Sequence, residues 1–153
     1  MRDQIFSIIQ TEGPIHIELL KKRLIELNHI GRIGDRISSR VEKTINFLVE
    51  QDSIYKDNKN FLKLPNHKLS TFRSPLNYKR PIEWVSDEEI SLAICYIIED
   101  QVSFIYDELP KAIAKLFGWE RSPNTLSQRI DELVKGLLSD KILIQKDNKL
   151  LIR

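Results

Sequence analysis

The chain has 153 residues, of which 41% are hydrophobic and 30% charged, with 24 Lys and Arg against 22 Asp and Glu. This composition fits one compact domain or two small ones, and no apolar run reaches the roughly 20 residues needed to cross a bilayer. Since the first residues also lack a signal-peptide layout, we expect a soluble cytoplasmic protein with no membrane partner.

The small net charge of +2 is unevenly distributed along the chain. Residues 1–66 carry 11 basic and 9 acidic side chains, residues 67–86 carry 4 and 1, and residues 87–153 carry 9 and 12. The front of the chain is therefore basic and the back is acidic, so the two halves need not share a partner.

The first quarter of the sequence predicts two helices. Isoleucines at helical spacing place one at residues 3–11, which Gly13 and Pro14 should end. Residues 14–16 should be a short extended piece, followed by a second helix at about residues 18–28 and a turn at residues 29–34. The positions expected to be buried in the second helix are Leu19, Leu20, Ile25 and Leu27.

The stretch at residues 31–48 predicts a turn followed by a basic amphipathic helix. One side of this helix is apolar and should face the core, with Ile37, Val41, Thr44, Ile45 and Leu48. Cations gather on another side, a pattern typical of a recognition helix, although a solvated surface helix is the alternative. Two lysines of the predicted hairpin that follows this helix complete the set. The candidate nucleic-acid-binding residues are Arg32, Arg36, Ser39, Arg40, Lys43, Lys56 and Lys59.

A β-hairpin at residues 53–64 should complete the order helix, short strand, helix, helix, hairpin. The same order returns as a helix at residues 87–100 capped by Ser86 and Asp87, a strand at 104–106, a helix at 108–117, a third helix opening at Ser122 and Pro123, and a hairpin at 141–152. The predicted fold is therefore mainly α with small β-hairpins (α+β). It consists of tandem winged-helix (helix-turn-helix) repeats at residues 1–66 and 87–153, joined by an ordered linker at residues 67–86.

The two repeats can be matched residue by residue. Ile15 corresponds to Ile105, and Arg40 corresponds to Arg129. The positions that match Arg36, Ser39 and Lys43 hold Thr125, Gln128 and Glu132, so the third helix of repeat two loses two cations and gains a carboxylate. We therefore expect repeat one to make most contacts with DNA and repeat two to face protein.

The linker should be extended and basic, because the connecting stretch at residues 65–85 contains three prolines and four cations. It also carries more large apolar side chains than a free linker would. We therefore expect it to pack on both halves through Phe72, Leu76, Tyr78, Ile82 and Trp84.

Several stretches together resemble a known family over nearly the whole chain. They are EGPIH at residues 12–16, the pattern Arg32-x-Gly34-x-Arg36-Ile37, the linker ending in IEWVSDEEI, and the reduced second repeat. The family is a C-terminal domain of unknown function, number 3320, found in large bacterial proteins that are similar to superfamily 1 helicases and often carry a nuclease segment. The resemblance implies an accessory module whose partner is a helicase or nuclease polypeptide, in cis or in trans. It transfers no catalytic residue.

The side chains that usually carry chemistry are scattered. His16, His29 and His67 fall on different predicted elements, without metal-ligand spacing, so we expect no metal, cofactor or catalytic residue. A phosphate-binding loop of the helicase type is absent, so any motor would lie outside this chain. The lone Cys95 is interpreted as a packing residue, with a nucleophile as the alternative. Trp84 and Trp119 fit a core better than a base-stacking site.

Two classes of function fit these observations. The first is a non-catalytic nucleic-acid-binding module that positions DNA for an attached or associated helicase or nuclease, with weak and mostly sequence-independent binding. The second is a protein-protein docking module of the same machinery, because fold does not determine function. A transcriptional repressor has less support, since neither an effector pocket nor a dimerisation helix is evident.

Overall fold

The computed structural model describes residues 1–75 and 78–153, so the expectation for Leu76 lies outside the described residues. The chain divides into two compact units, Met1–Lys68 and Leu69–Arg153. Each contains helices and one small antiparallel sheet, which confirms the α+β class.

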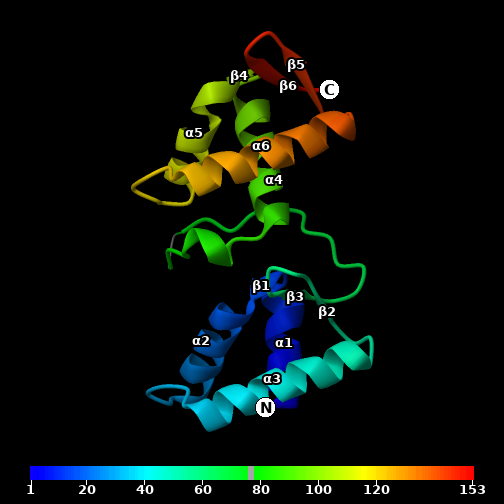
Figure 1. Cartoon of the computed structure of the whole chain (residues 1–153), viewed down its shortest axis with the longest axis vertical. Helices are drawn as coiled ribbons and strands as arrows, with labels where there is room; N and C mark the ends of the chain where they lie inside the picture. Colours follow the sequence, from blue (N-terminus) through cyan, green and yellow to red (C-terminus); the bar gives the residue numbers. More distant parts are fainter. Residues whose placement is uncertain (76–77) are drawn as a thin grey trace. The chain divides into compact units, whose positions relative to one another are not determined.

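The first unit contains three helices and three short strands (Figure 1). They are α1 (Arg2–Glu12), β1 (Ile15–His16), α2 (Ile17–Asn28), α3 (Asp35–Glu50), β2 (Tyr55–Lys56) and β3 (Phe61–Lys63). The sheet has the order β1-β3-β2, so β1 pairs with the returning strand of the hairpin and Ile15 lies opposite Leu62. This pairing brings the segment between the first two helices against the hairpin.

The boundaries of α1 and α2 follow from local chemistry. Gly13 sits so close to the end of α1 that an added Cβ would lie 2.5 Å from the carbonyl oxygen of Ile9. His16 caps α2, because its Nδ1 accepts a hydrogen bond from the backbone N–H of Glu18 at 3.2 Å. An ion pair of 2.9 Å between Arg23 and Glu12 then joins α2 to α1. The EGPIH motif therefore has a structural role at this turn.

The core of the first unit contains most of the predicted positions. Leu19 and Leu20 are fully buried, as are Val41 and Ile45 on α3. The prediction for Leu27 was wrong, since 56% of this residue is exposed. It lies in the last turn of α2, beyond the buried stripe that contains Leu20 and Leu24. Ile25 is half-buried.

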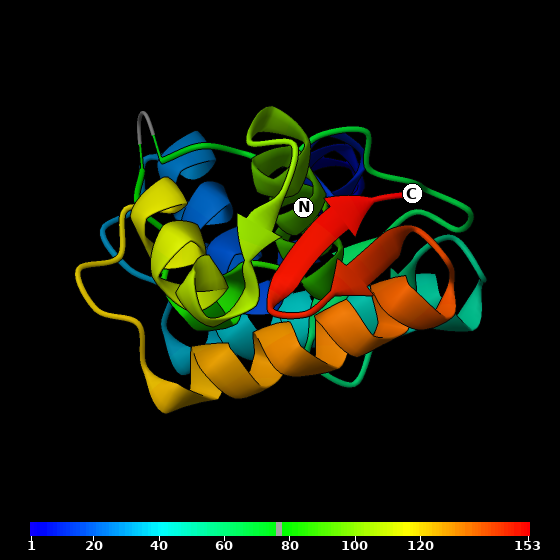
Figure 2. The ribbon, with the colours of Figure 1, turned by 90° about the horizontal axis from the view of Figure 1, so that it is seen from above.

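The second unit repeats the same order of elements and adds two short 3₁₀ turns. It contains η1 (Ile82–Trp84), α4 (Asp87–Asp100), β4 (Phe104–Ile105), η2 (Tyr106–Glu108), α5 (Leu109–Leu116), α6 (Asn124–Ser139), β5 (Leu143–Lys146) and β6 (Lys149–Ile152). The sheet order β4-β6-β5 has the same connectivity as the first sheet. Figure 2 shows the β5–β6 hairpin lying beside α6. The predicted cap of α4 is confirmed, because Ser86 Oγ accepts a hydrogen bond from Glu89 N at 3.2 Å.

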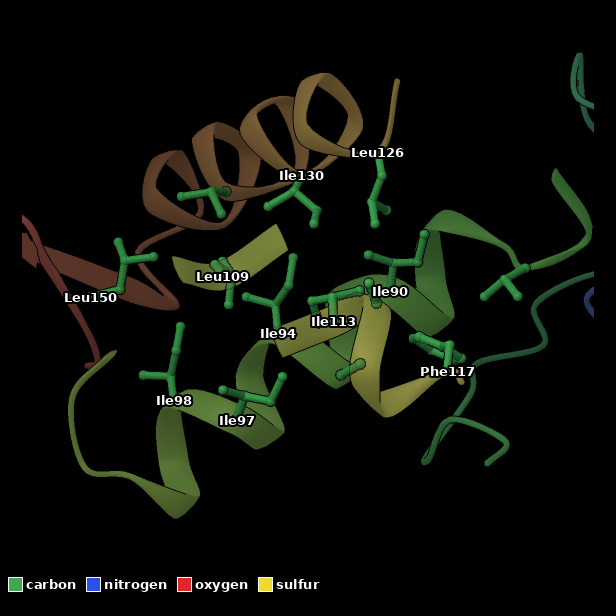
Figure 3. Close-up of a cluster of buried hydrophobic side chains, with 14 of the residues drawn as sticks. Ile90, Ile94, Ile97, Ile98, Leu109, Ile113, Phe117, Leu126, Ile130 and Leu150 are labelled. Atoms are coloured by element: carbon green, nitrogen blue, oxygen red, sulfur yellow. The ribbon is translucent and has the colours of Figure 1, made fainter. Parts of the chain in front are cut away.

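The core of the second unit is built from α4, α5 and α6 around isoleucine and leucine side chains (Figure 3). Leu126 and Ile130 point from α6 toward α4, where Ile90 and Ile94 are fully buried. Trp119 belongs to this core with 9% exposure, and its ring stacks on Phe117 with centroids 5.0 Å apart. Trp119 is thus a core residue, as its sequence position suggested.

A buried ion-pair network holds part of the predicted linker against α4. Glu89 is fully buried, and its two carboxylate oxygens accept hydrogen bonds from Arg80 at 2.6 and 2.9 Å. Arg73 adds a bond of 3.3 Å from Nε to the same carboxylate. The Nε1 of Trp119 donates to the carbonyl oxygen of Arg80 at 2.7 Å. Residues 69–86 thus belong to the second unit, through contacts that charge counting along the sequence does not reveal.

Candidate nucleic-acid interface

Three of the candidate cations form a straight stripe on α3. At 100° per residue, Arg36, Arg40 and Lys43 fall within an arc of about 60° on the helix. All three are exposed, whereas Val41 and Ile45 on the opposite side are fully buried. Within residues 1–75 and 78–153, none of the three forms an ion pair. We call these residues the cationic stripe.

Two candidates lie next to the cationic stripe. Arg32 is exposed in the turn before α3, and Ser39 is exposed on the helix itself, one residue before Arg40. Gly34 precedes the helix in an extended conformation, and Asp35 occupies the first turn, where a carboxylate is favoured by the positive end of the helix dipole. Five of the seven candidates therefore lie on or just before one helix.

Two residues that the sequence analysis did not select extend the stripe. Phe47 follows Lys43 by four residues, lies within the same 60° arc and is 43% exposed. The guanidinium of Arg2, at the start of α1, lies 5.1 Å from the centroid of the Phe47 ring. Figure 1 shows α3 crossing α1 near the N-terminus. The helical projection alone would have found Phe47, but Arg2 comes from another helix.

The lysines of the first hairpin are placed differently from Arg36 and Arg40. Lys56 lines a cavity of about 320 Å³ together with Lys21 of α2 and Glu42 of α3. Glu42 lies on the other flank of α3 from the cationic stripe and forms an ion pair of 3.1 Å with Lys21. Lys59 is exposed at the hairpin tip, where its backbone N–H donates to Asp57 Oδ1 at 2.9 Å. The structure thus brings the arginines together on one flank and Lys56 with mixed charges on the other.

The matching helix of the second unit has no such stripe. Arg129 occupies the position of Arg40, but its guanidinium donates to Asp87 Oδ1 at 2.7 Å and to the carbonyl oxygens of Val85 and Ile82 at 2.6 and 3.1 Å. Thr125, Glu132 and Gly136 occupy the positions of Arg36, Lys43 and Phe47. The cation retained from the pattern is therefore used to hold α6 against the segment that precedes α4.

Two titratable groups of the second unit have shifted pKa values for reasons of packing. Burial, followed by the charge of Glu99, raises the pKa of the Cys95 thiol, so the reactive thiolate is disfavoured at neutral pH. Burial, together with a hydrogen bond from the Tyr106 hydroxyl to Asp131 at 2.9 Å, raises the pKa of Tyr106 to about 12. Both groups are packing residues in this geometry.

No group of three or more His, Cys, Asp and Glu side chains in the described part of the chain is arranged to hold a metal ion. Likewise, no helix within residues 1–75 and 78–153 combines the length and apolarity that crossing a membrane requires.

Comparison with known proteins gives one partial match. Residues 1–39 match the model of a family described as protein of unknown function DUF3320. This range comprises α1, β1, α2 and the first residues of α3, including Arg36 and Ser39. No curated protein and no solved structure shows significant similarity to the chain.

Proposed function

We propose that this chain is a non-catalytic nucleic-acid-binding module whose first unit makes the phosphate contacts. The observation that carries the proposal is the cationic stripe, three exposed cations in a row that have no ion-pair partner among the described residues. Cations on a helix can pair with nearby carboxylates, as Lys21 does with Glu18 and Glu42. Unpaired cations in a straight row instead suit an extended polyanion.

The proposed architecture is two winged-helix units in tandem. The order helix, strand, helix, helix, hairpin in each unit supports it, as does the shared connectivity in which the first strand pairs with the last. In such a unit the third helix is the element that meets nucleic acid. The cationic stripe lies on this helix, α3, in the first unit.

The contacts are expected to position nucleic acid rather than read its sequence. Arginine and lysine side chains on one flank of a helix can follow a phosphate backbone, and such contacts are similar for every sequence. We further propose that the module serves a helicase or nuclease polypeptide, attached or associated. This part rests on the resemblance of the EGPIH stretch and the Arg32–Ile37 pattern to the family found beside such enzymes.

The test is a fluorescence anisotropy titration of labelled duplex and single-stranded DNA at several salt concentrations. The variant Arg36→Ala/Arg40→Ala should bind much more weakly, and the slope of log K against log salt should become shallower by about two units. The matched control is Lys111→Ala/Lys135→Ala, which removes two exposed cations from the second unit. Equal binding by wild type and the first variant would remove the stripe from the proposal.

A protein-docking function of the second unit is the second candidate, favoured by exposed apolar side chains on its sheet. Ile144 lies directly opposite Leu151, and Ile105 is 39% exposed on the neighbouring strand. Apolar residues gathered on a free sheet face commonly mark a protein-interaction surface. Replacing Ile144 with Lys should leave DNA binding unchanged and abolish co-purification with the helicase or nuclease polypeptide. If Ile144→Lys still co-purifies fully, the second candidate fails.

A further inference from the structure

We infer that Phe47 is a stacking site for an unpaired base, at the end of the phosphate path marked by the cationic stripe. The inference rests on the proposed function and adds to it a ligand class, a single-stranded segment or a duplex with an unpaired end. The observation behind it is an aromatic ring that is 43% exposed in line with a row of cations.

The Phe47 ring is aligned with the cations along α3. Arg36, Arg40, Lys43 and Phe47 are separated by four, three and four residues, which is the spacing of a single stripe along a helix. At a rise of 1.5 Å per residue, neighbours in this row are about 4.5–6 Å apart along the axis. A nucleic-acid backbone that follows the cations therefore reaches the ring within one more nucleotide.

The Phe47 ring is held in place by a cation from another helix. Arg2 lies 5.1 Å from the ring centroid, so its guanidinium covers one face of Phe47 and adds a further cation at this end of the stripe. Aromatic rings and arginine planes are the two surfaces on which proteins stack unpaired bases. Glu50, the last residue of α3, follows on the same side and disfavours phosphate beyond the ring. The path of favourable charge thus ends at the aromatic side chain.

The second unit differs from the first at this position. The position that matches Phe47 is Gly136, where an added Cβ would meet no atom within 4 Å. A large side chain would be tolerated sterically at that position of α6, yet the second unit has no ring there. It also has Thr125 and Glu132 where the first unit has the cations Arg36 and Lys43. The second unit therefore lacks the ring and two of the three cations, and its remaining cation, Arg129, is bound to Asp87. This is expected if the ring and the cations of the first unit serve one ligand.

The ligand class follows from the chemistry of stacking. Bases inside a duplex are already stacked on both faces, so a ring on the protein surface can reach only a terminal pair or an unpaired base. The phosphate path alone would bind duplex and single strands by charge, without this preference. Phe47 should therefore make the module select strands that present free bases.

The experiment compares two labelled single strands of equal length and charge, one with thymine bases and one with abasic sites throughout. Wild type should bind the base-bearing strand about tenfold more tightly than the abasic strand, which is the size of effect expected for one stacked base. Phe47→Ala should bind both strands at the abasic level, with an unchanged salt slope. Phe47→Trp should restore the difference, and Phe47→Leu, which keeps an apolar side chain under Arg2, should not.

Two further measurements separate the possible failures. Gly136→Phe, which adds a ring without cations, should not alter the ratio of the two affinities. If Phe47→Ala weakens binding to both strands equally, or changes neither, the ring serves only as a packing partner of Arg2 and the stacking inference is overturned while the proposed function stands. If wild type binds neither strand at low salt, the proposed function itself fails, and the stacking site fails with it.

Discussion

The Nε of Arg129 donates a hydrogen bond of 2.7 Å to the carboxylate of Asp87, which joins the middle of α6 to the first residue of α4. Arg129 also donates to the carbonyl oxygens of Val85 and Ile82, so one guanidinium orders the segment that leads into α4. In the first unit the matching residue, Arg40, is exposed and belongs to the cationic stripe. Matching arginines of the two units are thus placed for different roles.

This difference predicts opposite consequences for the two alanine variants. Arg129→Ala should lower the free energy of unfolding by about 2 kcal/mol, because charge-assisted hydrogen bonds are lost and backbone carbonyls lose their partner. Arg40→Ala should change it by less than about 0.5 kcal/mol, as usual for an exposed residue without such contacts, but weaken DNA binding. Urea denaturation followed by circular dichroism checks both values. If Arg129→Ala had the same free energy of unfolding as wild type, the contacts with Asp87 and the carbonyls would contribute little to stability.

The Glu89 network predicts a pH dependence of stability in the second unit. Burial by itself would raise the pKa of Glu89, but the hydrogen bonds and charges of Arg80 and Arg73 outweigh it and lower the pKa below its ordinary value of 4.5. A carboxylate with a depressed pKa stabilises the fold above the pKa of the unfolded chain, and this contribution is lost as the pH falls through the folded value. Stability should therefore decline below about pH 4.5.

The variant Glu89→Gln tests this assignment. It leaves the buried guanidinium of Arg80 without its counter-charge, so it should cost about 3 kcal/mol at pH 7 and much less at a pH below the lowered pKa of Glu89, where the native carboxylate is also uncharged. Both tryptophans, Trp84 and Trp119, belong to the second unit, so intrinsic fluorescence during urea denaturation reports on this unit. An equal loss at both pH values would assign the effect to packing rather than charge.

Core truncation should be costly in both units. Val41 and Ile130 are fully buried at matching positions of the two units, one residue after Arg40 and Arg129 respectively. Replacing either with Ala should cost about 1–4 kcal/mol, depending on how far the surroundings collapse into the cavity. Thermal unfolding by circular dichroism measures the loss for Val41→Ala, and tryptophan fluorescence measures it for Ile130→Ala. A change below about 0.5 kcal/mol would contradict the placement of that residue in a packed core.

Tyr106 should remain protonated in strongly basic solution. Because its pKa is raised to about 12, its contribution to stability is complete below the unfolded value near 10 and is lost as the pH rises toward 12. Absorbance at 295 nm during a fast pH titration should reveal a late-ionising tyrosine in the native protein that Tyr106→Phe lacks. Asp131→Asn should shift this ionisation to lower pH, since it removes the carboxylate that accepts a hydrogen bond from the Tyr106 hydroxyl. If Tyr106 ionised at the same pH in Asp131→Asn as in wild type, its raised pKa would be due to burial and the charge of Asp107.

The sequence alone was sufficient to place the helices and hairpins, because helical spacing, capping side chains and turn residues act over a few positions. Val41, Ile45 and Leu48 were identified as buried from their angles on one helix, and Ser86 as a cap from its place before three acidic residues. The cationic stripe was visible for the same reason, since Arg36, Arg40 and Lys43 belong to one helix whose geometry is regular.

Contacts between residues far apart in the chain were decided by tertiary structure. A helical projection gives the angle of each side chain but not which element packs on each flank. It could therefore predict neither that Lys56 lies away from the stripe nor that Arg2 lies over Phe47. Charge counting described residues 67–86 as a basic linker, whereas Arg80 of this segment is paired with the buried Glu89. Arg129 likewise matches Arg40 in the repeat, but its guanidinium is bonded to Asp87, which lies 42 residues earlier in the chain. This contact exists only because α4 and α6 pack together, so the sequence did not reveal it.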